Sequence, residues 1–345
     1  MTAVRRIGVV DVGTNSIHLV IGARAAGGRV RALRHERKLV FLGEGGLADN
    51  RLRPAAIRRA LRVLRQYAGI LAQERVTTVE AVATSAVRNA VNGPAFVRQA
   101  RRLTGLPLRV ISGLEEARLA FVGIQQARRS RRATALLAIG GGSAQAAVGQ
   151  GTVVRYCASA PLGASRLRQR FIHHDPVRAA ELQRLARHIT RSIAPLTRGL
   201  RQQRLEALGG SGLIAQVLAA AWRLERRRPS VPRLRSGPTL SVVEGSAAAR
   251  DAALSHVEGR RRPPARPALT RAAIARLVAW LARSTASQRR RLPGLDPARQ
   301  VMALPTALVL LIWMEQAGAA RIRHASGSIR EGLLARLDGR ARVHL

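Results

Sequence analysis

Several residue types are scarce in this chain, and each shortage excludes a class of structure. The single cysteine, Cys157, excludes an internal disulfide bond and a zinc site built from several cysteines. Aromatic residues make up 3% of the chain, so the core must consist mainly of aliphatic side chains. The longest apolar run, residues 303–314, falls short of the roughly 20 residues that span a membrane. The apolar run at residues 7–10 is too short for a signal peptide, and we expect a soluble, cytoplasmic protein that does not bind membranes.

Acidic residues are also scarce. Lys and Arg number 60 against 19 Asp and Glu, which gives a formal charge of +41. A charge of this size attracts polyanions such as polyphosphate or nucleic acid. Lys38 is the only lysine, however, and a GC-rich genome that replaces lysine codons with arginine codons would give the same composition. Both interpretations stay open, and without an aromatic-rich basic module we expect nucleic acid to bind only nonspecifically.

Two similar units in the two halves of the chain indicate an internal duplication. Each consists of a buried strand, a glycine-containing turn and a returning strand. They occupy residues 7–10, 11–16 and 17–23 in the first half and 135–139, 140–143 and 144–148 in the second. A length of 345 residues suits two domains. We expect an N-terminal α/β domain over residues 1–128 and a C-terminal α/β domain over residues 129–345.

The rest of the chain alternates helix and strand patterns, which is typical of α/β proteins. In the first half the pattern predicts helices at residues 54–74 and 94–103 and strands at residues 78–83 and 108–111. In the second half Asp175 and Pro176 predict the start of one helix, and Thr270 predicts the cap of another that ends near Ala286.

Two further segments of the second half stand out by composition. Residues 226–267 are rich in Arg and Pro and predict an insertion. Residues 303–316 predict an almost wholly apolar helix, buried between the domains or against the first sheet. We expect the terminal helices to pack partly on the first domain.

The turn Asp11-Val12-Gly13-Thr14-Asn15-Ser16 has the residue types of a phosphate loop. Glycine lets the backbone approach an anion closely, and successive N–H groups and hydroxyls can surround phosphate oxygens. An ordinary β-hairpin turn uses the same residues, so this turn alone decides nothing. Together with the second turn, Gly140–Gly142 and Ser143, it predicts a cleft with one phosphate-gripping hairpin on each wall.

The segment Ser112-Gly113-Leu114-Glu115-Glu116 predicts the first turn of a helix. Ser112 and Glu115 have the spacing of a capping box, which gives Glu115 a structural role. Glu116 has no such role and is a candidate base that accepts a proton from water. A solvated glutamate favoured by the helix dipole is the competing interpretation.

Six motifs occur in the order seen in the Ppx/GppA phosphatase family, the exopolyphosphatases and guanosine pentaphosphatases. The chain resembles the short, two-domain members of this family. The motifs lie at residues 11–16 (DVGTNS), 83–90 (ATSAVRNA), 111–118 (ISGLEEAR), 140–143 (GGGS), 209–212 (GGSG) and 329–332 (IREG).

The resemblance implies a two-domain, actin-like ATPase fold, in which a ribonuclease H-like α/β unit is duplicated around an interdomain cleft. It implies attack of water on a terminal phosphoryl group with Mg²⁺ or Mn²⁺ as cofactor. The implied substrate is inorganic polyphosphate or a guanosine polyphosphate, pppGpp, and a homodimer is a further expected partner.

The resemblance also implies a role for each matching residue. Glu116 would be the general base, and Arg88 and Arg330 would bind phosphate. The remaining phosphate contacts would be Asp11, Gly13, Thr14, Asn15, Ser16, Gly140, Gly141, Gly142, Ser143, Gln145, Gly210 and Ser211. Asp11 and Glu116 are the candidate metal ligands.

Three departures from the family pattern bear on activity. The second loop of the family begins with Asp and ends with Glu, but this chain has Ala138 and Gln145 there. The Arg-Leu-Gly segment of the family appears as Phe41-Leu42-Gly43. Losing the carboxylate at Ala138 removes an expected metal ligand, although Gln145 can still orient a water molecule.

Two functions follow from these observations. The first is a phosphohydrolase that releases terminal phosphate from polyphosphate or pppGpp; Glu116, Arg88 and the intact first loop favour it. The second is a catalytically impaired protein that binds polyphosphate or an alarmone as a regulator; Ala138 and Gln145 favour it. A kinase of the same fold lacks any acceptor-binding signature.

Overall fold

The computed structural model describes residues 6–24, 30–128, 132–200, 205–210, 212–226 and 268–338. Residues 227–267 of the predicted insertion, and Ser211 of the predicted site, lie outside the described residues.

The first half of the chain forms a sheet of five strands. The strands are β1 (Arg6–Val12), β2 (Ser16–Arg24), β3 (Val30–Leu39), β4 (Thr78–Ala83) and β5 (Leu108–Val110), and they lie in the order β3-β2-β1-β4-β5. The neighbours β3, β2 and β1 are antiparallel, whereas β1, β4 and β5 are parallel. The helices of this half are α1 (Pro54–Gln73), α2 (Ser85–Arg88), α3 (Gly93–Thr104) and α4 (Gly113–Arg128).

The second half repeats this arrangement. Its strands are β6 (Ala133–Ile139), β7 (Ala144–Gln150), β8 (Val153–Ala160), β9 (Glu206–Gly209), β10 (Leu269–Thr270) and β11 (Arg321–His324). The order β8-β7-β6-β9-β11 has the same sequence of antiparallel and parallel neighbours as the first sheet, with β10 added at the edge. This repetition confirms the predicted duplicated α/β fold.

The second half contains the remaining helices of the described chain. They are α5 (Ala164–Phe171), α6 (Ala179–Ser192), α7 (Ala194–Thr197), α8 (Leu213–Arg226), α9 (Arg271–Arg283), α10 (Ala286–Arg290), the short 3₁₀ helix η1 (Gln300–Met302), α11 (Ala303–Gln316) and α12 (Ile329–Leu337). Among the described residues, no helix combines the length and the apolar character that crossing a membrane requires.

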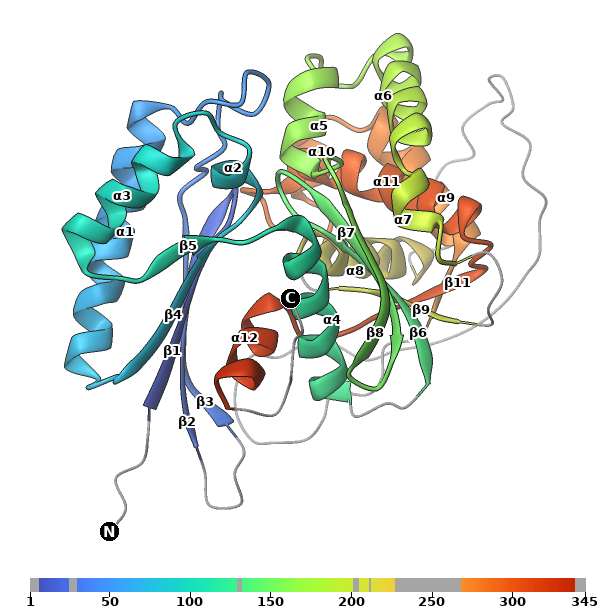
Figure 1. Ribbon diagram of the computed structural model, residues 1–345. Helices are drawn as coiled ribbons and strands as arrows, with labels where there is room; N and C mark the ends of the chain where they lie inside the picture. Colours follow the sequence, from blue (N-terminus) through green and yellow to red (C-terminus); the bar gives the residue numbers. More distant parts are fainter. Residues whose placement is uncertain are drawn as a thin grey trace.

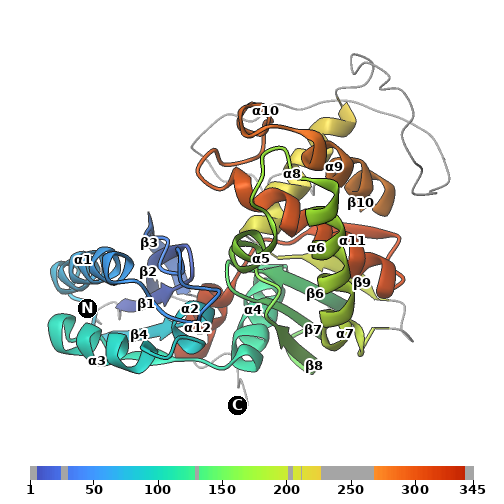
Figure 2. The same ribbon diagram turned by 90° about the horizontal axis from the view of Figure 1, so that it is seen from above.

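Two helices fill the space between the sheets. Figures 1 and 2 show α1 and α3 on the outer face of the first sheet, with α4 and α12 on its inner face. Leu119 of α4 and Leu333 of α12 pack with Val9 of β1 in one buried cluster. Phe121 of α4 packs with Leu136 of β6 in another. Helix α4 is therefore buried on two sides and contacts both sheets.

Most elements of the first half begin and end within one or two residues of their predicted positions. Two predictions for the second half are wrong. The helix expected to start at Asp175-Pro176 begins at Ala179 instead. The side chain of Asp175 accepts a hydrogen bond from the backbone N–H of Ala286, 2.7 Å away, at the start of α10. Asp175 therefore caps a helix that is distant in sequence.

The helix that Thr270 was expected to cap is present, but it ends slightly earlier than predicted. Thr270 does accept a hydrogen bond from the N–H of Ala273, at 3.2 Å, but α9 ends at Arg283. Thr285 then caps a second helix, α10, by accepting from the N–H of Gln288 at 3.3 Å. Because Thr285 caps a new helix, α9 ends at Arg283 rather than near Ala286.

The apolar helix α11 is buried, as predicted, but not between the domains or against the first sheet. It lies in the core of the second half, where Leu310 packs with Ile274 of α9 and Ile214 of α8. Trp313 is fully buried there, and its indole N–H donates to the carbonyl oxygen of Leu196 at 3.0 Å. The terminal helix that does pack on the first sheet is α12.

Candidate active site

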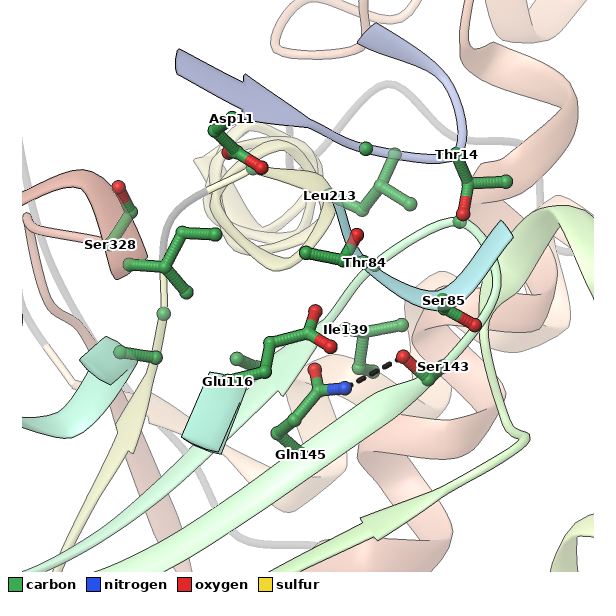
Figure 3. Close-up of a pocket in the computed structure, with 18 of the residues that line it drawn as sticks. Asp11, Thr14, Thr84, Ser85, Glu116, Ile139, Ser143, Gln145, Leu213 and Ser328 are labelled. Carbon is green, nitrogen blue, oxygen red and sulfur yellow. Dashed lines mark hydrogen bonds between the residues drawn. The ribbon is translucent and has the colours of Figure 1, made fainter. Parts of the chain in front are cut away.

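The two predicted phosphate loops face each other across one cleft. In both loops a glycine N–H donates to the carbonyl oxygen three residues later: Gly13 to Ser16 at 3.0 Å and Gly140 to Ser143 at 2.9 Å. A Cβ atom placed on Gly141 would lie 2.8 Å from the Cβ of Thr14, so the tips of the two loops touch. A cavity of about 160 Å³ opens beside this contact (Figure 3).

Because β1, β4 and β5 are parallel, the residues that follow β4 and β5 lie at the same edge of the sheet as the first loop. The N–H of Thr84 donates to the carbonyl oxygen of Val12 at 3.1 Å, and the N–H of Ile111 donates to that of Ala83 at 3.1 Å. The carboxyl ends of parallel strands meet at one edge of a sheet. Residues that follow β1, β4 and β5 in sequence therefore converge on this cleft.

The alternation of side chains along a strand decides which residues face the cavity. In β1, Ile7 and Val9 pack on the inner side with α4 and α12, so Asp11 points the same way. In β6, Leu136 packs against α4, and Ala138 shares its face. The expected carboxylate position at Ala138 therefore lies in the lining of the cavity, where only a methyl group is present.

Glu116 lies in the first turn of α4 and points into the cavity (Figure 3). Its Oε2 accepts a hydrogen bond from Arg88 Nη1 at 3.0 Å. Burial raises the pKa of Glu116 to about 7, partly offset by Arg88 and reinforced by the negative charge of Asp11. A carboxyl group with this pKa is half ionised near neutral pH and suits a general base.

Arg88 links Glu116 to both halves of the protein. Besides Glu116, its guanidinium donates to the carbonyl oxygen of Ile111 at 3.0 Å and to Ser143 Oγ of the second loop at 3.5 Å. Arg88 is not among the residues that line the cavity itself. In this structure it orients the glutamate, and its predicted role as a phosphate ligand stays a prediction.

Asp11 faces an arginine from the last helix. Arg330 Nη1 lies 3.8 Å from Asp11 Oδ2, and both side chains are largely buried. Burial raises the pKa of Asp11 to about 6, against the lowering effect of Arg330. The Nε atom of Arg330 is buried without a hydrogen-bond partner. That donor is available to an anion in the cavity.

In the second loop, the side chain of Gln145 hydrogen-bonds to that of Ser143. Gln145 Nε2 donates to Ser143 Oγ at 2.7 Å and to Ser159 Oγ at 3.4 Å. The side chains of Gln145 and Glu116 lie beside each other in Figure 3. An amide at this place can orient a water molecule but adds no negative charge.

Asn15 connects the two halves of the protein. Its Oδ1 accepts from Ser165 Oγ at 2.9 Å, and its Nδ2 lies 3.1 Å from the sulfur of Met302. Both ends of the amide are therefore engaged by residues of the second half. Asn15 lines the cavity, but in this structure its side chain links the two halves.

The structure gathers most of the predicted site residues in one cavity. The predicted residues in its lining are Asp11, Gly13, Thr14, Asn15, Ser16, Glu116, Gly140, Gly141, Gly142, Ser143, Gln145, Gly210 and Arg330.

Other lining residues were not predicted as site residues. They include His18, Thr84, Ser85, Arg299 and Ser328. Thr84 and Ser85 belong to the segment that resembles the family, and their position at a strand end was the available signal. Arg299 precedes η1 and carries no local signal, because only the folding of the second half brings it to the cleft.

The donor set for a divalent cation is poor. Among the described residues, no group of three or more His, Cys, Asp or Glu side chains could hold a metal ion. Glu116 is hydrogen-bonded to Arg88, and Asp11 faces Arg330. The two positions where the resemblance expects further carboxylates are the neutral Ala138 and Gln145. These residues do not fit a tightly bound resident metal.

Comparisons with known proteins point to one family of phosphatases. The model of the Ppx/GppA phosphatase family matches residues 20–340. Exopolyphosphatase 1 of Mycobacterium leprae is 27% identical over 97% of this chain and 91% of its own length. Exopolyphosphatase 2 of Mycobacterium tuberculosis is 35% identical, but that match spans 57% of this chain and 64% of the relative, less than two-thirds of its length.

Solved structures agree over almost the whole chain. The crystal structure of an exopolyphosphatase from Cytophaga hutchinsonii has a TM-score of 0.79 at 26% identity and covers 97% of this chain and 98% of its own. The Ppx/GppA enzyme of Aquifex aeolicus, 22% identical, has a TM-score of 0.71 over 96% of this chain and 99% of its own, and shares the fold. The chain belongs to the Ppx/GppA phosphatase family.

Proposed function

We propose that this protein releases terminal phosphate from inorganic polyphosphate by attack of water, with Glu116 as the general base. The observation that carries the proposal is the placement of Glu116. Its carboxyl group is buried, has a pKa of about 7 and points into the cavity between two phosphate loops. The names of the relatives, which are exopolyphosphatases, support the same reaction.

The groups that line the cavity suit this reaction. The oxygen of a water molecule forms a bond with the terminal phosphorus, and the bond from that phosphorus to the bridging oxygen breaks. Glu116 accepts a proton from the water, and the shortened polyphosphate leaves with the bridging oxygen. Arg330 and Arg299 place positive charge at the cavity, where the phosphoryl oxygens carry negative charge.

The shape and lining of the cavity favour polyphosphate over a guanosine polyphosphate. A volume of about 160 Å³ accommodates phosphate groups. No Phe, Tyr or Trp is among the described residues that line the cavity, so no aromatic side chain offers a stacking surface for guanine. A guanosine polyphosphate is therefore the less favoured substrate.

A second candidate function is binding without turnover. Ala138 and Gln145 favour it, because both replace carboxylates that the resemblance leads us to expect near the reacting groups. The protein would then bind polyphosphate or an alarmone as a regulator.

The Mg²⁺ or Mn²⁺ expected from the resemblance, the cytoplasmic location and a homodimer stay predictions. A magnesium ion that arrives on polyphosphate would be part of the substrate.

Phosphate release decides between these functions. Long-chain polyphosphate and pppGpp are each incubated with the protein in the presence of Mg²⁺ or Mn²⁺, with Glu116→Gln as the background. We expect release from polyphosphate that exceeds both the background and the release from pppGpp. Tight polyphosphate binding without release above background would replace the hydrolase with the regulator.

A further inference from the structure

Four charged side chains form a closed cluster away from the cavity. Arg109 donates to Glu115 at 2.6 and 3.0 Å and to Glu80 at 2.8 Å. Arg336 donates to Glu115 Oε1 at 2.9 Å and also to Glu80 Oε1. Each carboxylate thus contacts both arginines, and none of the four residues lines the cavity.

The cluster joins four separate elements of the fold. Glu80 lies on β4, Arg109 on β5, Glu115 in the first turn of α4 and Arg336 in the last turn of α12. The Glu115 and Glu80 side chains are 8% and 13% exposed. Removing one member of such a cluster leaves a buried charge without its partner, which is strongly unfavourable.

Glu115 differs here from its predicted role. Its N–H is capped by Ser112 Oγ at 3.0 Å, as a capping box requires. Its carboxylate, however, binds the two arginines instead of completing the capping box. The side chain next to Glu116 in sequence is thus tied to α12.

Helices α4 and α12 also touch along their backbones. A Cβ atom on Gly123 would lie 2.1 Å from the carbonyl oxygen of Ser328, and one on Gly332 would lie 2.1 Å from that of Leu119. Contact this close leaves little room for one helix to slide on the other. A displacement of α12 therefore moves the first turn of α4 as well.

Both helices supply side chains to the cavity, Glu116 from α4 and Arg330 from α12. We propose that Arg336 and Glu80 are positioning residues, which tie the last turn of α12 to the first turn of α4 and so fix both helices with Glu116 and Arg330 facing the reacting phosphate. This inference rests on the proposed function. The charged cluster, which lies outside the cavity, would thus fix the positions of both Glu116 and Arg330.

The test compares two ion pairs at opposite ends of α4. Arg336→Met removes the charge and keeps much of the aliphatic side chain. Arg128→Met does the same at the last turn of α4, where Arg128 donates to Glu206 at 2.7 Å. The side chains of these two arginines are similarly exposed, 21% and 22%. Arg128→Met is thus a control for lost stability.

We expect Arg336→Met to lower kcat on polyphosphate by about 10- to 100-fold, because a displacement near 1 Å costs about this much. KM should change less than kcat, and Arg128→Met should keep nearly full kcat. Arg336→Lys should recover part of the loss, and Glu80→Gln should reproduce a milder form of it. Equal kcat for Arg336→Met and Arg128→Met would overturn the inference.

A readout without turnover separates this inference from the proposed function. Infrared difference spectra between each protein and its Glu116→Gln derivative report the titration of the Glu116 carboxyl group. Looser packing in Arg336→Met should hydrate this group and lower its pKa, while Arg128→Met should leave it unchanged. If the wild type releases no phosphate, the proposed function fails, and this titration alone decides the inference. An unchanged titration in Arg336→Met would refute it.

Discussion

Ala138 and Gln145 lie directly opposite each other on the paired strands β6 and β7, on the side that faces α4. Asp11 and His18 are opposite each other in the same way on β1 and β2. Cβ atoms of directly opposite residues are about 4.5–5.5 Å apart. A carboxylate at each of positions 138 and 145 would therefore face the same point in the cavity, where a cation could bind both.

The double variant Ala138→Asp/Gln145→Glu is predicted to gain a divalent-cation site. We expect a higher rate of Mg²⁺-dependent phosphate release than in the wild type, because a bound cation can supply several kcal/mol to the transition state. Electron paramagnetic resonance of Mn²⁺ should show ions bound to the variant and few bound to the wild type. Mn²⁺ binding without any gain in rate would show that the missing carboxylates do not limit turnover.

Replacing the proposed base should separate catalysis from binding. Glu116→Gln is close to isosteric and still accepts a hydrogen bond from Arg88, so the fold should persist. Turnover should fall by about 10²–10⁴-fold, the usual contribution of a general base. The Kd for polyphosphate, measured by calorimetry, should stay nearly unchanged. A wild type that is active and insensitive to this substitution would show that the base is another group.

The pKa of Glu116 predicts opposite pH dependences for activity and stability. The group accepts a proton only when ionised, so kcat should rise with pH through about 7. Because burial raises this pKa above that in the unfolded chain, the group stabilises the fold at low pH, and this stability is lost as pH rises through about 7. Glu116→Gln should therefore gain more thermal stability relative to the wild type at pH 8 than at pH 5. A difference in Tm that is the same at both pH values would contradict this assignment.

Polyphosphate binding should depend on the cleft more than on the overall charge. Arg88→Ala should weaken binding far more than Arg128→Ala, because Arg88 contacts Glu116 and Ser143 at the cleft. Arg128 lies away from the cleft, in the last turn of α4 beside Glu206. With a formal charge of +41, affinity should fall steeply with added salt in each variant. Equal losses for the two variants would mean that general surface charge binds the anion.

Because the two loops touch, adding a single methyl group at Gly141 should lower activity. In Gly141→Ala the new Cβ atom would lie 2.8 Å from the Cβ of Thr14 and 2.7 Å from Nδ2 of Asn15, whose amide is held at both ends. The loops must separate, and kcat/KM should fall by about 10- to 100-fold. Gly140→Ala is the control, because its nearest contact is an ordinary 3.4 Å from the carbonyl oxygen of Ser143. Equal activity of the two variants would show that the spacing of the loops is not critical.

Local patterns were sufficient to predict the frame of the site. The strands that flank residues 11–16 and 140–143, and the helix that begins before Glu116, depend on side-chain alternation, turn residues and a capping serine. All of these act over a few residues. The repetition of the strand–turn–strand unit also implied a second sheet like the first and two loops that face each other.

Other features depend on contacts between residues that are far apart in sequence. Asp175 caps α10 rather than its own helix, Glu115 binds Arg336 rather than completing the cap of α4, and α11 packs within the second half. The sequence alone determined which residues end the strands and form the loops, since short-range sterics and hydrogen bonding decide that. Only the tertiary structure decided which charges meet in the cleft, because the packing of the second half of the chain brings Arg330 to Asp11 and Arg299 to the same cavity.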